Sequence, residues 1–455
     1  MYQLLLSAAL AHRALAAPAM GGSIVVPENG YRTAPYHGSY TGTPTTSGAV
    51  MASTTLAASV ASKPLNPTAT YYNAEGVPKN PMPAPYTPAG GLGTNGTRPR
   101  YMVESDFDFE SIALGLYQEY IELDLFHDGL ARFSDEEFEE AGLGPEMRSL
   151  IEFMANQEVG HATLLTNMLG EAAPVQCVYN YPYRTVREWV DFNQRLTRFG
   201  ESGVWGFINH LDSREVGQLL AQSIATEARQ QMVFRQMSGL TPMSVWFENG
   251  WPQSWTWTML APYISYCPAG QTRLSWQNFP TLHIQNNPNI NRVYPNRTDT
   301  DGSETVGNRI TNPSVSNITE GMQCINAEEV GQDCSPAIAR NRTEPLSFPG
   351  KRVYFEWDMP GQAVGPNNSY ITSTTAGSPR FVGWSNQLNL TYSPLTITGN
   401  NSGYTIQPNS TVYGDQGIIN GTMAVMLTDT DLHVTPFNLS MLNPHIAALG
   451  LYMAG

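Results

Sequence analysis

The chain has 455 residues, enough for two or three domains, and its 39 acidic and 24 basic residues give it a net charge of −15. This acidic balance argues against a nucleic-acid-binding protein or one that docks on anionic membranes. Charged residues make up only 14% of the chain, and its 33 prolines and 40 glycines indicate a folded protein that is rich in loops.

The N-terminus has the features of a secretory signal peptide over residues 1–17. An apolar run ends in the small residues 14–17, a typical cleavage pattern, although the basic start is missing and His12 and Arg13 interrupt the run. Residues 18–100 are rich in Pro, Gly, Ser, Thr and Ala and carry few charges. This composition predicts a disordered stalk, because it offers too little apolar surface to bury.

Ten sequons for N-linked glycosylation favour the same secretory route. Nine of the ten follow residue 290, so we expect the surface of the C-terminal part to carry glycans. The sequons are at Asn95, Asn296, Asn317, Asn341, Asn367, Asn389, Asn400, Asn409, Asn420 and Asn438.

The four cysteines are even in number and have no CxxC spacing. In a secreted chain they indicate two disulfides with three conceivable connectivities. We favour Cys177 with Cys267 and Cys324 with Cys334, because the second pair closes a short loop. No apolar run reaches about 18 residues, so we expect no transmembrane helix.

Four long segments within residues 101–240 have apolar residues at the three- to four-residue spacing of amphipathic helices. They predict a four-helix bundle. Ser134 and Glu137 form a capping-box pattern that predicts a short helical turn between the first two segments. The first segment begins near Ser105, and the second runs from Pro145 to Gly170. The third covers residues 184–211, with a bend near Gly200 and Gly203, and the fourth covers residues 213–237.

The helical periodicity ends after residue 240. Residues 241–345 contain many Trp, Pro and Asn residues without a long period, which predicts an irregular connector. Within residues 346–455, short runs of β-forming residues alternate with Gly, Asn and Pro turns. The sequence therefore predicts an α+β protein, in which a helical bundle is followed by a β-rich, glycosylated module.

Each of the four predicted helices carries one glutamate in its apolar stripe, and a buried carboxylate is costly unless something neutralises it. The residue three positions after the second glutamate is His161, which shares its helix face. Two Glu-x-x-His units and two further glutamates form the di-metal ligand set of such bundles. Here Gln230 stands where the second histidine is expected. The glutamates are Glu119, Glu158, Glu201 and Glu227.

Two interpretations of these positions stay open. In the first, the four glutamates, His161 and Gln230 converge and bind Fe or Mn, as one ion or as two. In the second, the same residues form a metal-free polar network with Tyr120 and Arg229. The remaining histidines that we considered have no partner pattern, and we interpret them as structural or surface residues; they are His127, His210 and His283.

Three stretches of the bundle resemble the secreted ferritin-like domain family. Residues 109–126, 157–161 and 225–229 are similar to its first, second and fourth helices. The Trp-rich residues 242–257 and the sequon-rich tail resemble its fungal branch, which includes stress-response and sexual-development proteins. The resemblance covers residues 101–455 and implies a ferritin-like fold with a stress or developmental role. Members of the family often have His at the position of Gln230.

The function that we expect is therefore a secreted, glycosylated ferritin-like protein with a stress-response or developmental role, either non-catalytic or weakly metal-binding. One alternative is a carboxylate-bridged di-metal oxidase. A second alternative is a structural cell-wall glycoprotein that uses its stalk and sugars. No HExxH, GxSxG or P-loop motif suggests other chemistry, and the sequence points to no substrate or protein partner.

Overall fold

The computed structural model describes residues 101–238, 242–269, 271, 273–287, 349–411 and 421–453. Among the helices of these residues, none combines the length and the apolar character of a membrane span. Several expectations concern residues outside this part of the chain: the signal peptide, the stalk, Cys324, Cys334, and the sequons at Asn95, Asn296, Asn317, Asn341 and Asn420.

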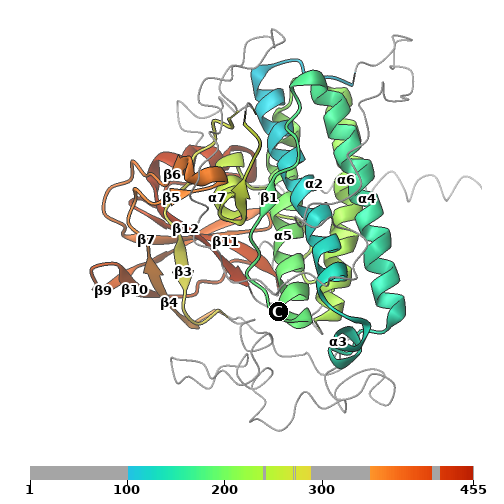
Figure 1. The fold of residues 1–455 in the computed structure, drawn as a ribbon. Coiled ribbons are helices and arrows are strands. Elements are labelled where there is room, and N and C mark those ends of the chain that lie inside the picture. Colours follow the sequence, from blue (N-terminus) through green and yellow to red (C-terminus); the bar gives the residue numbers. More distant parts are fainter. Residues whose placement is uncertain are drawn as a thin grey trace, which may run out of the picture. The chain divides into compact units, whose positions relative to one another are not determined.

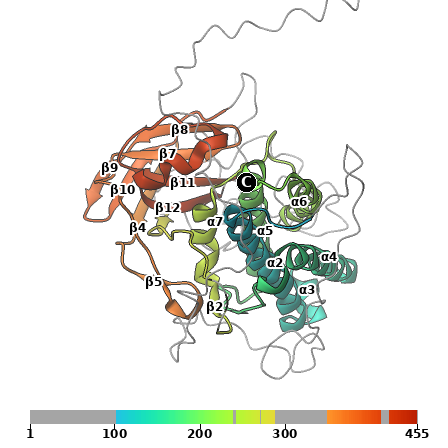
Figure 2. The same cartoon turned by 90° about the horizontal axis from the view of Figure 1, so that it is seen from above.

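Four long helices lie alongside one another and form a bundle (Figures 1 and 2). Helix α2 is in contact with α4 and α5, and α6 is in contact with the same two helices. Their bounds are α2 (Asp106–Arg132), α4 (Pro145–Leu169), α5 (Val186–Phe207) and α6 (Arg214–Met237), and the short α3 (Asp135–Glu140) lies between α2 and α4 in the chain.

The ends of these helices follow from local signals in the sequence. The hydroxyl of Ser105 accepts a hydrogen bond from the backbone of Asp108 and caps α2. The expected capping box of Ser134 and Glu137 opens α3. Helix α4 begins at Pro145 and stops before Gly170, whose φ of 68° an L side chain rarely adopts.

Helix α5 is one continuous helix, without the bend that we expected near Gly200 and Gly203. Its glycines instead permit close packing. A Cβ atom on Gly200 would lie 2.6 Å from the Cγ atom of Gln118, and a Cβ atom on Gly206 would lie 1.8 Å from the carbonyl oxygen of Trp251. The bundle and the chain that follows it therefore approach α5 more closely than any side chain on these positions would allow.

The segment expected to be an irregular connector contributes a helix and two strands: α7 (Gln253–Leu260), β2 (Ile264–Tyr266) and β3 (Leu282–Ile284). Every residue of α7 is buried. Trp251, Trp255 and Trp257 are 0% exposed. A helix that is buried on all sides has no polar face, so a search for amphipathic periodicity cannot detect it.

Two four-stranded antiparallel sheets follow, in the strand orders β3-β4-β10-β9 and β12-β11-β7-β8. These strands confirm the predicted α+β class. Two short pairs, β1 with β2 and β5 with β6, complete the described strands. The remaining bounds are β1 (Val178–Tyr179), β4 (Arg352–Trp357), β5 (Ala363–Val364), β6 (Tyr370–Ile371), β7 (Phe381–Asn386), β8 (Asn389–Pro394), β9 (Thr396–Gly399), β10 (Ser402–Ile406), β11 (Thr422–Thr428) and β12 (Ile446–Met453).

The helices and the second sheet share one apolar core. Ala424 and Met426 of β11 belong to the same cluster of buried side chains as the bundle. Polar contacts add to this packing: the indole of Trp255 donates to Asn443, and the amide of Asn249 donates to the backbone oxygen of Ser385. The β-rich part is therefore packed on the bundle through buried apolar side chains as well as through hydrogen bonds.

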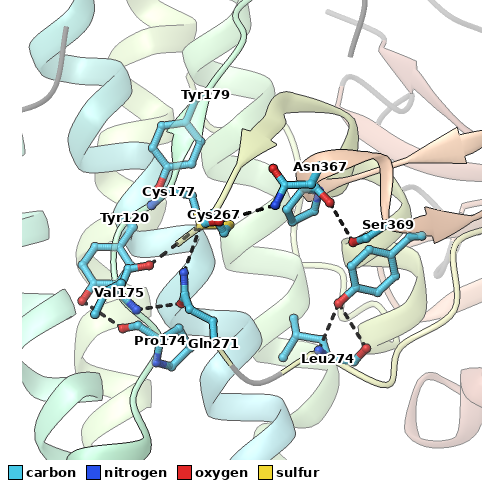
Figure 3. The surroundings of a disulfide bond; sticks show 12 residues. Tyr120, Pro174, Val175, Cys177, Tyr179, Cys267, Gln271, Leu274, Asn367 and Ser369 are labelled. Atoms are coloured by element: carbon cyan, nitrogen blue, oxygen red, sulfur yellow. Dashed lines mark hydrogen bonds between the residues drawn. A yellow bond between two sulfur atoms is a disulfide. The ribbon is translucent and has the colours of Figure 1, made fainter. Parts of the chain in front are cut away.

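A disulfide joins Cys177, which precedes β1, to Cys267, which follows β2 (Figure 3). This is one of the two pairings that we favoured. The side-chain amide of Gln271 donates to the sulfur of Cys177, and its oxygen accepts from the backbone of Val175. The side chain of Asn367 donates to the backbone oxygen of Cys267. The bond therefore fixes the segment before α5 against the segment after α7.

We expect Gly206→Ala to lower the free energy of unfolding by about 2 kcal/mol or more, because the new methyl group would overlap the backbone of residue 251. The matched control is Gly160→Ala in α4, where an added Cβ atom has no neighbour within 4 Å. This control should gain up to about 1 kcal/mol from the better helix propensity of alanine. Urea unfolding of both variants tests the pair, and equal midpoints would contradict the packing of α5 against residue 251.

Candidate metal centre

Three of the four predicted glutamates meet His161 inside the bundle. The cluster consists of Glu119 from α2, Glu158 and His161 from α4, and Glu227 from α6. One potential ligand atom from each of the four lies within 4.8 Å of the others. The Nδ1 atom of His161 is 3.1 Å from Glu158 Oε2, 3.3 Å from Glu119 Oε2 and 3.7 Å from Glu227 Oε1. We call these four residues the Glu/His cluster.

A fifth residue, Glu122, lies beside the Glu/His cluster. It follows Glu119 by three positions on α2, so both side chains point to the same side of the helix. Its Oε1 atom accepts a hydrogen bond of 2.8 Å from Gln118. Glu122 is not evident from the sequence, because the apolar stripe that contains Glu119 does not reveal that α2 is buried over nearly its whole length. The three-residue spacing from Glu119 was the signal that could have found it.

The tautomer of His161 follows from its contact with Thr226. The hydroxyl of Thr226 donates to the backbone oxygen of Ser223, and it lies 2.9 Å from the Nε2 atom of His161. Since a hydroxyl has one proton, its oxygen must accept from Nε2–H. The Nδ1 atom therefore faces the carboxylates, either as a second N–H donor or as the free lone pair of a metal ligand.

Burial sets the charge balance of this region. It raises the pKa of Glu119 to about 8, and the positive charge of His161 opposes the shift. It also raises the pKa values of Glu122 and Glu227 well above the ordinary range, with neighbouring carboxylates adding to the effect. For His161, burial lowers the pKa, but Glu158 and Glu119 outweigh it and raise the pKa to about 12. If all of these carboxyl groups were ionised, their negative charge would exceed the single positive charge that His161 can provide.

The donor atoms of the cluster fit a divalent cation. The Oε2 atoms of Glu122 and Glu227 are buried and accept no hydrogen bond from any residue that the structure describes, and the Oε2 atom of Glu119 has only His161 Nδ1 beside it, at 3.3 Å. Buried carboxylate oxygens without donors are costly unless a cation compensates them. Carboxylates with one imidazole are a ligand set that suits Fe or Mn. We therefore conclude that these residues can hold such an ion.

Gln230 lies at the cluster, but it presents its amide nitrogen. That nitrogen donates to Glu158 Oε1 and, at 3.2 Å, to Gln157 Oε1. The opposite orientation of the amide would place two oxygens against each other, since a carboxylate only accepts. Gln230 thus holds Glu158 in place through its nitrogen, whereas metal binding, as in the first interpretation, would need its oxygen to face the cluster.

Glu201 does not lie with the other three glutamates. The prediction that all four glutamates converge is therefore wrong for Glu201. Its Oε2 atom is 3.2 Å from the guanidinium of Arg198, one turn earlier on α5. The same guanidinium contacts Glu248 and donates to Gln231 at 2.6 Å. Glu201 is buried, as predicted, but it belongs to a separate ion-pair network between α5, α6 and the segment before α7.

The three other histidines considered from the sequence lie outside the cluster. The ring of His210 packs against Phe437 with centroids 4.5 Å apart. The exposed His283 lies 3.1 Å from Asp358. His127 is half-buried on α2, and burial lowers its pKa. None of the three belongs to the metal-ligand group found among the described residues.

The described sequons differ in exposure. Asn400 and Asn409 are exposed, whereas Asn389 and Asn438 are half-buried. Asn367 is only 5% exposed, and its side-chain nitrogen is the donor to Cys267 beside the disulfide (Figure 3). A glycan on that nitrogen is incompatible with this packing, which argues against Asn367 as an acceptor.

We expect Glu201→Gln to flatten the pH dependence of stability. Burial raises the pKa of Glu201 from 4.5 to about 8, so between these values the folded chain binds a proton that the unfolded chain releases. The stability that this bound proton contributes is therefore lost as pH rises from about 4.5 to 8. The variant should reduce this slope by up to about 1.4 kcal/mol per pH unit. Urea unfolding with chelator at several pH values measures it, and parallel slopes would refute the assignment.

Comparison with known proteins agrees with this description. Residues 105–240 match the ferritin-like domain family. Protein rds1 of Schizosaccharomyces pombe is 51% identical to this chain over 369 residues, which cover 81% of this chain and 85% of rds1. That similarity reaches well beyond the helical bundle. The chain therefore belongs to the same family as protein rds1 and carries a ferritin-like domain over residues 105–240.

Proposed function

We propose that the chain is a secreted, glycosylated ferritin-like protein whose Glu/His cluster binds a divalent ion, Fe²⁺ or Mn²⁺, as part of a stress-response or developmental role. The observation that carries the metal proposal is the set of buried carboxylate oxygens around His161 that accept no hydrogen bond from the described residues. A purely structural cell-wall role would leave the cost of burying these groups without a purpose.

The residues of the cluster have distinct parts in this proposal. Glu119, Glu158, Glu227 and His161 hold the ion. Thr226 accepts from the far nitrogen of His161 and keeps Nδ1 directed at the carboxylates. A bound iron or manganese ion supplies a redox-active centre, and the buried bundle around it limits the access of water.

The face of the bundle between α4 and α6 is the one through which we expect an ion to exchange with solvent. The cluster lies beneath the surface between α4 and α6, where Gln157 and Thr226 are only half-buried. Gly160, next to His161, is exposed and has open space around its Cβ position. On this side, half-buried polar side chains lie between the solvent and the cluster.

Three features support secretion: a disulfide, exposed glycosylation sequons and a signal-like N-terminal segment. The bond between Cys177 and Cys267 is typical of proteins that fold in an oxidising compartment. The sequons at Asn400 and Asn409 are exposed, as glycan acceptors must be. The signal-like residues 1–17 agree with the same route. The stress or developmental role rests on the family resemblance of the sequence.

Metal binding should raise the melting temperature of the chelator-treated chain. An ion at 100 times its dissociation constant stabilises the folded state by about 2.7 kcal/mol. We expect Mn²⁺, and Fe²⁺ without oxygen, to produce this shift in the parent and in Glu152→Gln, an exposed control on α4. Glu158→Gln should lose it, because a ligand carboxylate becomes a neutral amide. A parent chain with no metal-dependent shift would refute the proposal.

Glycan mapping tests the secretory part of the proposal. In protein isolated from its native source, mass spectrometry of peptides should find glycans at Asn400 and Asn409, which are exposed, and none at the buried Asn367. Glycosidase treatment should lower the apparent mass. Unmodified Asn400 and Asn409 together with a free Cys177 thiol would contradict passage through the secretory route.

A further inference from the structure

We infer that the Glu/His cluster takes one metal ion per chain, because Arg198 and Gln230 engage the groups that a second ion would need. This inference rests on the proposed metal binding. A two-ion site in a helical bundle uses a carboxylate from each helix and a histidine on two of them. In this chain the third carboxylate, Glu201, and the second histidine position, Gln230, both have other partners.

The contacts of Glu201 keep a second cation away from it. Arg198 has a side chain that is 4% exposed, and a guanidinium keeps its positive charge at any physiological pH. Its contacts to Glu248 and Gln231 hold it in place from two other segments. Arg235 is a second buried guanidinium that acts electrostatically on Glu201. A metal ion at Glu201 would therefore lie beside permanent positive charge and would be repelled.

Gln230 prevents Glu158 from bridging two ions. The amide nitrogen of Gln230 donates to Glu158 Oε1, and Glu158 Oε2 faces His161 Nδ1 at 3.1 Å. A bridging carboxylate must offer one oxygen to each ion, but here Oε1 already accepts the hydrogen bond from Gln230. The neutral amide of Gln230 also supplies no charge to offset a second cation.

Glu122 does not replace the missing ligands. One of its oxygens is held by Gln118, and it lies outside the group of four whose ligand atoms are mutually within 4.8 Å. The metal-ligand group found among the described residues contains a single histidine, His161, so a second ion beside Glu122 would have no imidazole ligand of its own. Glu122 instead adds negative charge next to the single ion and so helps to balance it.

The test is the stoichiometry of Mn²⁺ binding to the full chain after removal of metal with a chelator. Isothermal titration calorimetry should give one ion per chain, and elemental analysis after desalting should agree. Electron paramagnetic resonance of the saturated protein should show the six-line spectrum of isolated Mn²⁺. Two ions per chain, or the spectrum of a coupled pair, overturns this inference and leaves the proposed metal binding intact. No binding at all overturns both.

Two isosteric variants test which glutamates are ligands of the ion. Glu201→Gln should keep one ion per chain with affinity within about twofold of the parent, because Glu201 does not contact the ion. Glu227→Gln removes a ligand carboxylate and should weaken binding at least tenfold. Loss of an ion in Glu201→Gln overturns the inference. Circular dichroism checks that both variants are folded, and the stoichiometry of the parent decides the question even if one variant does not fold.

Discussion

The burial of several carboxyl groups around a single imidazole is the constraint on which the rest of this structure depends. Glu119, Glu122, Glu158 and Glu227 are brought together by three helices, and His161 alone provides positive charge among them. Without an ion, such a core must take up protons to remain neutral. The hydrogen bonds that Gln118 and Gln230 donate, and the one that Thr226 accepts from His161, only orient these groups. They cannot neutralise them, because an amide and a hydroxyl carry no charge.

The Glu/His cluster and the buried ion pairs of Arg198 are separate networks. In the first, three carboxylates surround His161; in the second, Arg198 pairs with Glu201 and Glu248. The separation arises within α5, which directs Gly200 at α2 and Glu201 at the guanidinium of Arg198. The segment before α7 supplies Glu248, so the region that follows the bundle helps to define the charge inside it.

Much of the bundle could be predicted from the sequence, because helix caps and the 3.6-residue period are local signals. Ser105, Pro145 and Gly170 mark helix ends in both the sequence and the structure. The spacing of Glu158 and His161 fixes their common face before any tertiary contact is known. The convergence of Glu119 and Glu227 on them follows from the helix stripes.

The features that the sequence analysis missed depend on contacts between distant segments. Arg198 lies three positions before Glu201, so this pairing could be read from the spacing, whereas the contacts of Arg198 to Glu248 and Gln231 come from other segments and could not be inferred. Helix α7 has no polar face, so its pattern is indistinguishable from that of an irregular apolar segment. Asn367 looks like any other sequon until its packing on Cys267 is known.

The disulfide has a consequence for how the Glu/His cluster is assembled. Cys177 and Cys267 are 90 residues apart, and the ring that they close contains α5, α6 and α7 but neither α2 nor α4. Glu227 is therefore carried on a covalent ring, while Glu119, Glu158 and His161 precede it on an open chain. Closing the ring removes conformational entropy from the unfolded chain before the helices dock. Oxidation of two cysteines that are not themselves ligands thus lowers the entropic cost of bringing the last ligand to the other three.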